Sequence, residues 1–179
     1  MIEILRRLPI NGPGAGNRLM RFGNASIKVK PFQMVAWASI TLRTESLAGI
    51  HRSDLPRFPV LIDTGHGDSF TIQDTHLRTW ANRQPSDFLS LPRRVTINSR
   101  FLCQTRAAAL WIYPNLPGSE DIDSLRKPFR LALDGGMSVL PERIEYPRMP
   151  LLGLRTLLSN GLTMIVDGPN RAISLFSDR

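Results

Sequence analysis

The residues best suited to chemistry form the tripeptide Asp63-Thr64-Gly65, which directly follows the apolar run FPVLI. A carboxylate at the end of an apolar strand is costly to bury unless hydrogen bonds or a shared proton stabilise it. Gly65 lets the backbone turn and approach a ligand closely, and the Thr64 hydroxyl can hydrogen-bond to nearby backbone. An Asx-turn at a strand end also explains the tripeptide, so its context must distinguish the two interpretations.

A second segment, Leu151-Leu152-Gly153, lies far downstream and leads into a short helical pattern that Gly161 closes. Two strand patterns follow before the C-terminus. An apolar strand ending in Asp-Thr-Gly, followed by apolar-apolar-Gly, a short helix and two strands, resembles the retropepsin-like aspartic proteases, in particular bacterial members with a single Asp-Thr-Gly. The resemblance covers roughly residues 34–176 and is strongest at its two ends.

The resemblance implies a fold and an activity. The fold is mainly β, a retropepsin-like closed β-barrel with one or two short helices, in which the segment from Leu151 to Gly153 forms part of a ψ-loop beside Asp63. The activity is that of an aspartic endopeptidase, which needs two carboxyl groups around one water molecule. Because the chain has one Asp-Thr-Gly, we expect a homodimer in which Asp63 and its copy share a proton and activate the water. No cofactor is implied.

The same resemblance assigns Asp63 as the catalytic residue and places Thr64 and Gly65 in the active-site loop. It assigns substrate binding to His66, Gly67 and Asp68. It assigns the ψ-loop to Leu151, Leu152 and Gly153. His66 departs from the family pattern, in which a small residue is usual. His66, Asp68 and His76 match no metal-binding spacing, so we predict no metal site.

Other residues offer weaker chemistry. Asp134 and Asp167 each follow an apolar run and precede a glycine, but neither is followed by the Thr or Ser that the family uses, and turn chemistry explains both. Cys103, the single cysteine, is interpreted as a small core residue. The alternative to a protease is an inactive dimerisation or binding module that keeps the fold without turnover.

The elements that must position these residues are mostly strands. The 13 glycines and 14 prolines are spread along the chain, which favours many short strands joined by turns. Apolar patterning predicts strands at 34–42, 58–62, 69–72, 94–98, 107–113, 129–134, 137–140, 162–166 and 172–176. Asp74 is expected to cap a short helix. The polar stretch 114–128 is expected to be a long surface loop.

With 179 residues and 42% hydrophobic composition, the chain can bury one core. Residues 1–30 are expected to form a basic, flexible N-terminal segment that begins with a short helix, because GPGAG cannot hold a regular element. Residues 31–179 then form the protease domain. The substrate-covering flap is expected in a hairpin of RVTIN and RAAALWIY, with its tip between Asn98 and Cys103.

The charge and the cysteine content of the chain limit the partners that it is expected to bind and the cellular compartment in which it is expected to lie. The 23 basic and 15 acidic side chains give a net charge of +8, which permits nucleic-acid binding, but no dense basic run with interleaved aromatics points to it. The single cysteine excludes an intrachain disulfide and favours a reducing compartment. No apolar stretch is long enough for a membrane span. We therefore expect a cytoplasmic protein whose partners are its own copy and a polypeptide substrate.

Overall fold

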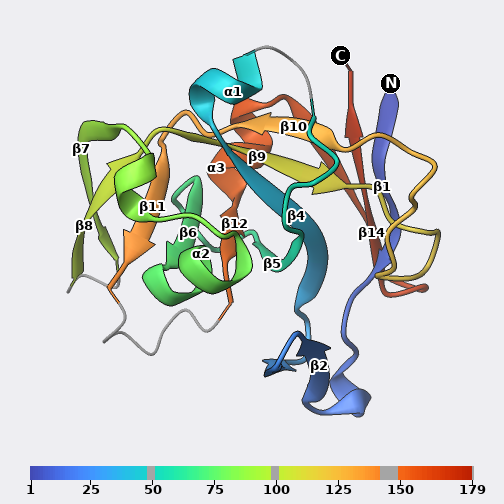
Figure 1. Ribbon diagram of the computed structural model, residues 1–179. Helices are drawn as coiled ribbons and strands as arrows, with labels where there is room; N and C mark the ends of the chain where they lie inside the picture. The colour runs from blue at the N-terminus through green and yellow to red at the C-terminus, as the bar shows by residue number, and fades with distance from the viewer. Residues whose placement is uncertain (48–50, 98–100, 142–148, 179) are drawn as a thin grey trace.

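The computed structural model describes residues 1–47, 51–97, 101–141 and 149–178. Within them the chain is mainly β, as predicted, with strands in three sheets and only short helices. The largest sheet crosses the middle of the molecule, and the two ends of the chain lie side by side at one edge (Figure 1). This architecture places the Asp-Thr-Gly segment at the end of a central strand.

The largest sheet has nine strands in the order β10-β9-β4-β5-β12-β6-β11-β8-β7. Their bounds are β4 (Met34–Leu42), β5 (Phe58–Asp63), β6 (Phe70–Gln73), β7 (Ser90–Ile97), β8 (Phe101–Arg106), β9 (Ala108–Tyr113), β10 (Phe129–Ala132), β11 (Met137–Leu140) and β12 (Leu151–Gly153). In the described residues β10 and β7 do not pair, so the sheet stays open and the predicted closed barrel is not seen. Closure depends on strand tilt and stagger, which apolar patterning does not encode.

A separate three-stranded sheet joins both ends of the chain in the order β1-β14-β13. It comprises β1 (Ile2–Pro9), β13 (Leu162–Asp167) and β14 (Ala172–Ser177). Leu5 and Leu8 of β1 are fully buried in the main hydrophobic core. The first residues thus form a packed strand, which differs from the expected short helix in a flexible segment.

A hairpin of β2 (Arg18–Phe22) and β3 (Ala25–Val29) forms the third sheet and extends below the main body in Figure 1. Its apolar side builds a second core with strands of the large sheet, from Ile27, Val29, Val35, Leu61, Met149 and Leu151. Phe22 also packs edge-on against Trp80, with ring centroids 5.2 Å apart. The hairpin therefore covers the Val35 end of β4, a strand that is buried along most of its length.

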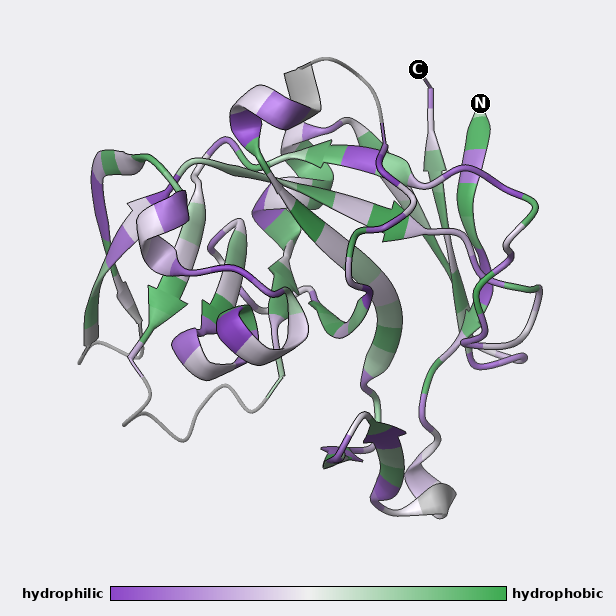
Figure 2. Ribbon diagram, viewed as in Figure 1, coloured by the Kyte–Doolittle hydropathy of each residue, from purple (hydrophilic) through white to green (hydrophobic). Residues whose placement is uncertain are grey.

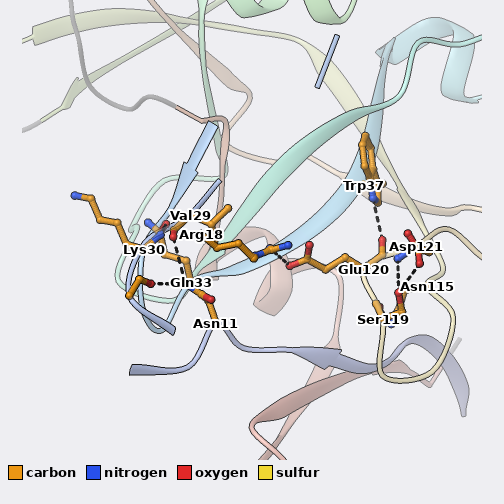
Figure 3. Close-up of polar contacts among 11 residues, drawn as sticks. Asn11, Arg18, Val29, Lys30, Gln33, Trp37, Asn115, Ser119, Glu120 and Asp121 are labelled. Carbon is orange, nitrogen blue, oxygen red and sulfur yellow. Dashed lines mark hydrogen bonds and ion pairs between the residues drawn. The ribbon is translucent and has the colours of Figure 1, made fainter. Parts of the chain in front are cut away.

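Polar contacts fasten this hairpin to the loop that precedes β10 (Figure 3). Arg18 forms an ion pair with Glu120 at 2.5 Å, and the Trp37 indole N–H donates to the Glu120 carbonyl at 2.9 Å. The Asn11 side chain donates to the Val29 carbonyl at 3.2 Å. Residues 11–30, expected to be flexible, are therefore bound to the body by both apolar and polar contacts.

The helices are short: α1 (Arg43–Leu47), α2 (Asp74–Trp80) and α3 (Leu154–Ser159), with 3-10 turns η1 (Pro13–Ala15) and η2 (Pro85–Asp87). Leu77 of α2 and Leu157 of α3 are buried in the main core, and hydrophobic residues recur along the central strands (Figure 2). Asp74 makes no side-chain cap and instead pairs with Arg78 at 3.0 Å. None of the described helices has the length and apolar composition needed to cross a lipid bilayer.

The hairpin that contains the predicted flap is formed by β7 and β8 at the edge of the large sheet. RAAALWIY, the expected second arm, instead contributes mainly to β9, which pairs with β4 and β10. The hairpin differs from the predicted one because its second strand, β8, begins at Phe101, before the RAAALWIY segment. Residues 98–100, where the tip was expected to begin, lie outside the described residues.

Candidate active site

Asp63 is the last residue of β5, directly opposite Gly153 of β12. β12 lies between β5 and β6, parallel to β5 and antiparallel to β6, although β5 and β6 are consecutive in the chain. The loop 64–69 must therefore pass over the end of β12. This ψ-shaped arrangement brings the predicted segment Leu151-Leu152-Gly153 against the Asp-Thr-Gly strand.

Gly153 is the point of closest backbone approach in this arrangement. A Cβ at this position would lie 1.9 Å from the Asp68 carbonyl oxygen and 2.6 Å from that of His66. The Gly153 N–H donates to the Ser69 carbonyl at 3.0 Å, and the Leu154 N–H donates to the His66 carbonyl at 3.2 Å. Only glycine allows β12 to hold the loop so closely.

The Asp63 carboxylate is half-buried and only partly engaged. Its Oδ1 accepts the Gly65 N–H at 2.9 Å, and its backbone carbonyl accepts the His66 N–H at 3.1 Å. No hydrogen bond from the described residues reaches Oδ2. A Cβ on Gly65 would lie 3.3 Å from Oδ1, so a larger residue would press on the carboxylate. Thr64 is exposed, and its hydroxyl has no hydrogen-bond partner in the described part of the chain.

The side chains of His66 and Asp68 contact residues outside the loop. The His66 ring shares a hydrogen bond with the Thr71 hydroxyl at 2.8 Å, and Asp68 pairs with Arg93 at 3.8 Å. Burial lowers the pKa of His66, while the negative charges of Asp68 and Asp63 partly oppose this shift. The imidazole is therefore neutral at neutral pH.

Ser69 anchors the loop to two segments that the sequence analysis did not connect with it. The Ser69 hydroxyl accepts the Gly135 N–H at 3.1 Å, and its carbonyl accepts the Thr156 hydroxyl at 2.7 Å. Ser69 and Thr156 are both buried. These partners lie 66 and 87 residues away in the chain, so local spacing carries no signal for them.

The other candidate side chains are engaged elsewhere. Asp167 lies in the three-stranded sheet, and its carboxylate accepts two hydrogen bonds from Asn170, which lower its pKa. Asp134 is exposed in the turn before β11. Cys103 packs with Val95 and Leu140, and burial raises the pKa of its thiol. Among the described residues, no three His, Cys, Asp or Glu side chains are placed to hold a metal ion.

Two surface hollows flank the Asp63 loop, one on each side of Thr64. The smaller, of about 160 Å³, is lined by Phe32, Gln33, Met34, Leu61, Ile62, Asp63 and Thr64. The larger, of about 560 Å³, is lined by Thr64, His66, Gly67, Leu154, Arg155, Leu158 and Ser159. The loop is thus an exposed ridge between two depressions, and the described residues of one chain do not enclose it.

Comparison of the chain with protein-family models, curated proteins and solved structures finds no match. A functional assignment therefore depends on the geometry of this site and on the motif resemblance.

Proposed function

We propose that the protein is an aspartic endopeptidase of the retropepsin-like type, with Asp63 as its catalytic residue. The observation that carries the proposal is the position of Asp63, at the end of β5 and opposite Gly153, with one carboxylate oxygen that accepts no hydrogen bond from the described residues. The Gly65 N–H bond to Oδ1 is that of an Asx-turn, which uses one carboxylate oxygen and leaves Oδ2 available for chemistry.

The active enzyme is a homodimer that pairs Asp63 with its copy. Aspartic protease chemistry needs two carboxyl groups, and neither Asp134 nor Asp167 has the surroundings of Asp63. The exposed Thr64, whose hydroxyl lacks a partner in the described chain, supports a second copy at this ridge. A two-fold axis beside the loop would bring the two carboxyl groups together.

In this dimer the two Asp63 carboxyl groups share one proton, because two adjacent negative charges repel each other. The ionised carboxylate takes a proton from water as the water oxygen attacks the peptide carbonyl carbon. The protonated carboxyl donates its proton to the carbonyl oxygen. The C–N bond of the resulting tetrahedral diol then breaks, and the carboxyl that took the proton from water returns it to the leaving nitrogen. His66, Gly67 and Asp68 border an extended polypeptide, which lies between the loop and the β7–β8 hairpin as an added strand.

The decisive experiment is cleavage of a peptide library at mildly acidic pH by wild type and by the Asp63→Asn variant. Cleavage by wild type that is lost in a folded Asp63→Asn protein supports the proposal. Equal cleavage by both proteins contradicts the aspartic mechanism. Binding of peptides without cleavage by wild type indicates the alternative, an inactive binding or dimerisation module.

The shared site has its own test. Specific activity should fall on dilution below the dimer dissociation constant, because a monomer holds one catalytic carboxyl group. Excess Asp63→Asn should inhibit wild type by forming defective heterodimers. If activity follows the wild-type concentration alone while subunits exchange, the dimeric site is wrong.

A further inference from the structure

Two arginines from separate elements converge beside the Asp63 loop. Arg93 lies on β7 and Arg155 lies on α3, yet both guanidinium groups reach Gly135 in the turn before β11. The Arg93 Nη1 and the Arg155 Nε lie 2.9 and 3.4 Å from the Cβ position of Gly135. Since both distances are measured from the same point, the two nitrogen atoms are at most 6.3 Å apart, the sum of 2.9 and 3.4 Å.

The positive charges are only partly balanced. The ion pairs of the described residues join Arg93 to Asp68 at 3.8 Å and leave Arg155 without a carboxylate partner. Asp134, the residue before Gly135, is exposed and forms no ion pair with either arginine within the described chain. Two guanidinium groups at this separation repel each other, so an anion between them would be favourable.

The turn that both arginines reach is fixed relative to the proposed catalytic residue. Gly135 is bound to the buried Ser69 hydroxyl, and Ser69 ends the loop that begins at Asp63. Arg155 lies two residues beyond Gly153 and lines the larger hollow together with Thr64 and His66. A chain bound along the loop therefore passes within reach of both guanidinium groups.

We propose that Arg93 and Arg155 form a subsite for an acidic side chain of the polypeptide substrate. This inference rests on the proposed protease function and adds a substrate class to it. A planar guanidinium binds a carboxylate through two parallel hydrogen bonds, and two such groups from different elements fix its direction as well as its charge. Arg93 already pairs with Asp68 at 3.8 Å. The subsite therefore prefers an acidic substrate side chain that also reaches Arg155.

The test compares peptides that carry Glu or its neutral counterpart Gln at each position around the cleaved bond. Wild type should cleave the Glu peptide with kcat/KM about tenfold higher at one position. Arg155→Gln and Arg93→Gln should each reduce this preference to about twofold or less, and Arg155→Lys should retain part of it. Arg94→Gln is the matched control, because it removes the same charge from the adjacent, exposed residue of β7. Equal kcat/KM for Glu and Gln at every position overturns the inference.

A binding measurement separates this inference from the proteolytic function. The Asp63→Asn variant keeps both arginines, so it should bind a fluorescent Glu peptide about tenfold more tightly than the Gln peptide, with the difference decreasing as salt is added. If wild type cleaves nothing but this preference is present, the protease proposal fails and the cationic subsite stands. If wild type cleaves peptides and neither cleavage nor binding favours Glu, the subsite fails alone.

Discussion

The turns that follow Asp63 and Asp167 use the carboxylates of these residues in opposite ways. In the turn between β13 and β14, Asp167 accepts the Asn170 N–H at 3.1 Å and the Asn170 side-chain amide at 2.7 Å. In the loop after β5, Asp63 accepts one hydrogen bond, from Gly65, through Oδ1. The first carboxylate stabilises its own turn through both oxygens, whereas the second keeps one oxygen available.

The two turns differ because different parts of the chain hold them. The Asp167 turn is closed by residues within it. The Asp63 loop is held from outside, by Gly153, Thr156 and Gly135, which all bond to Ser69. A loop that is stabilised by distant segments does not need its own carboxylate for stability, and this leaves Asp63 free for chemistry.

The largest expected effect tests this comparison directly. Asp63→Asn should reduce kcat/KM for peptide cleavage by at least about a thousandfold, because it keeps the side-chain shape and removes the titrating group. Asp167→Asn, the matched control, should leave kcat/KM within about twofold, because its turn lies in another sheet. Similar losses in both variants would mean that the two turns are not functionally different.

The next effect concerns how the Asp63 loop is held. Gly153→Ala should lower the free energy of unfolding by about 2 to 4 kcal/mol, because its Cβ would lie 1.9 Å from a backbone oxygen that cannot move alone. Gly67→Ala is the control, since nothing lies within 4 Å of its Cβ position in the same loop. Urea denaturation measures both variants. Equal stabilities would show that β12 does not constrain the loop.

The sequence predicted much of the fold where local patterning agrees with tertiary packing. The predicted ranges 34–42 and 137–140 coincide with β4 and β11. β1 was interpreted as a helix, and its buried residues Ile4, Leu5 and Leu8 do follow a helical spacing. Irregular pairing around Leu5 and a positive φ of 46° at Arg7 break the strand period of two.

The β2–β3 hairpin was missed although the sequence contains a signal for it. Gly23-Asn24 joins the two strands, and Gly23 has a φ of 54°, as tight hairpin turns require. Within the candidate site, Asp63 and Gly153 were predictable because each belongs to a local motif. The roles of Ser69 and Arg155 were not, because distant segments bind Ser69 and only tertiary contacts bring Arg155 to Gly135.

Acidification should weaken the packing of α2 before it affects the Asp167 turn. Burial lowers the pKa of His76 in α2 from 6.5 to about 4, so its neutral form is preferred in the folded protein. The unfolded chain binds this proton at higher pH, and stability therefore falls as pH decreases from about 6.5 towards 4. The pKa of Asp167 is lowered from 3.8, so its contribution is lost only below that range.

The His76→Phe variant measures this effect. Phenylalanine can keep the stacking on Trp80, whose ring centroid lies 3.8 Å from that of His76, and it cannot bind a proton. Urea denaturation at pH 7 and pH 4 should show a loss of stability in wild type that is smaller in the variant by about 1 to 2 kcal/mol, once the partial exposure of His76 is allowed for. An identical loss in both proteins would exclude His76 as the cause.

The smallest expected effect compares Thr64, which is proposed to contact a second chain, with Asn170, which stabilises a turn within its own chain. Thr64→Ala should raise the dimer dissociation constant about fivefold to tenfold, because the exposed hydroxyl is free in the described chain and one net hydrogen bond contributes about 1 kcal/mol. Asn170→Ala, the matched control, removes the donor that engages Asp167 and should affect folding stability without changing the dissociation constant. Sedimentation equilibrium over a dilution series measures both variants. If Thr64→Ala dissociates like wild type, the hydroxyl makes no contact across the dimer, and the exposed ridge around Asp63 must pair through its backbone or through the walls of the two flanking hollows.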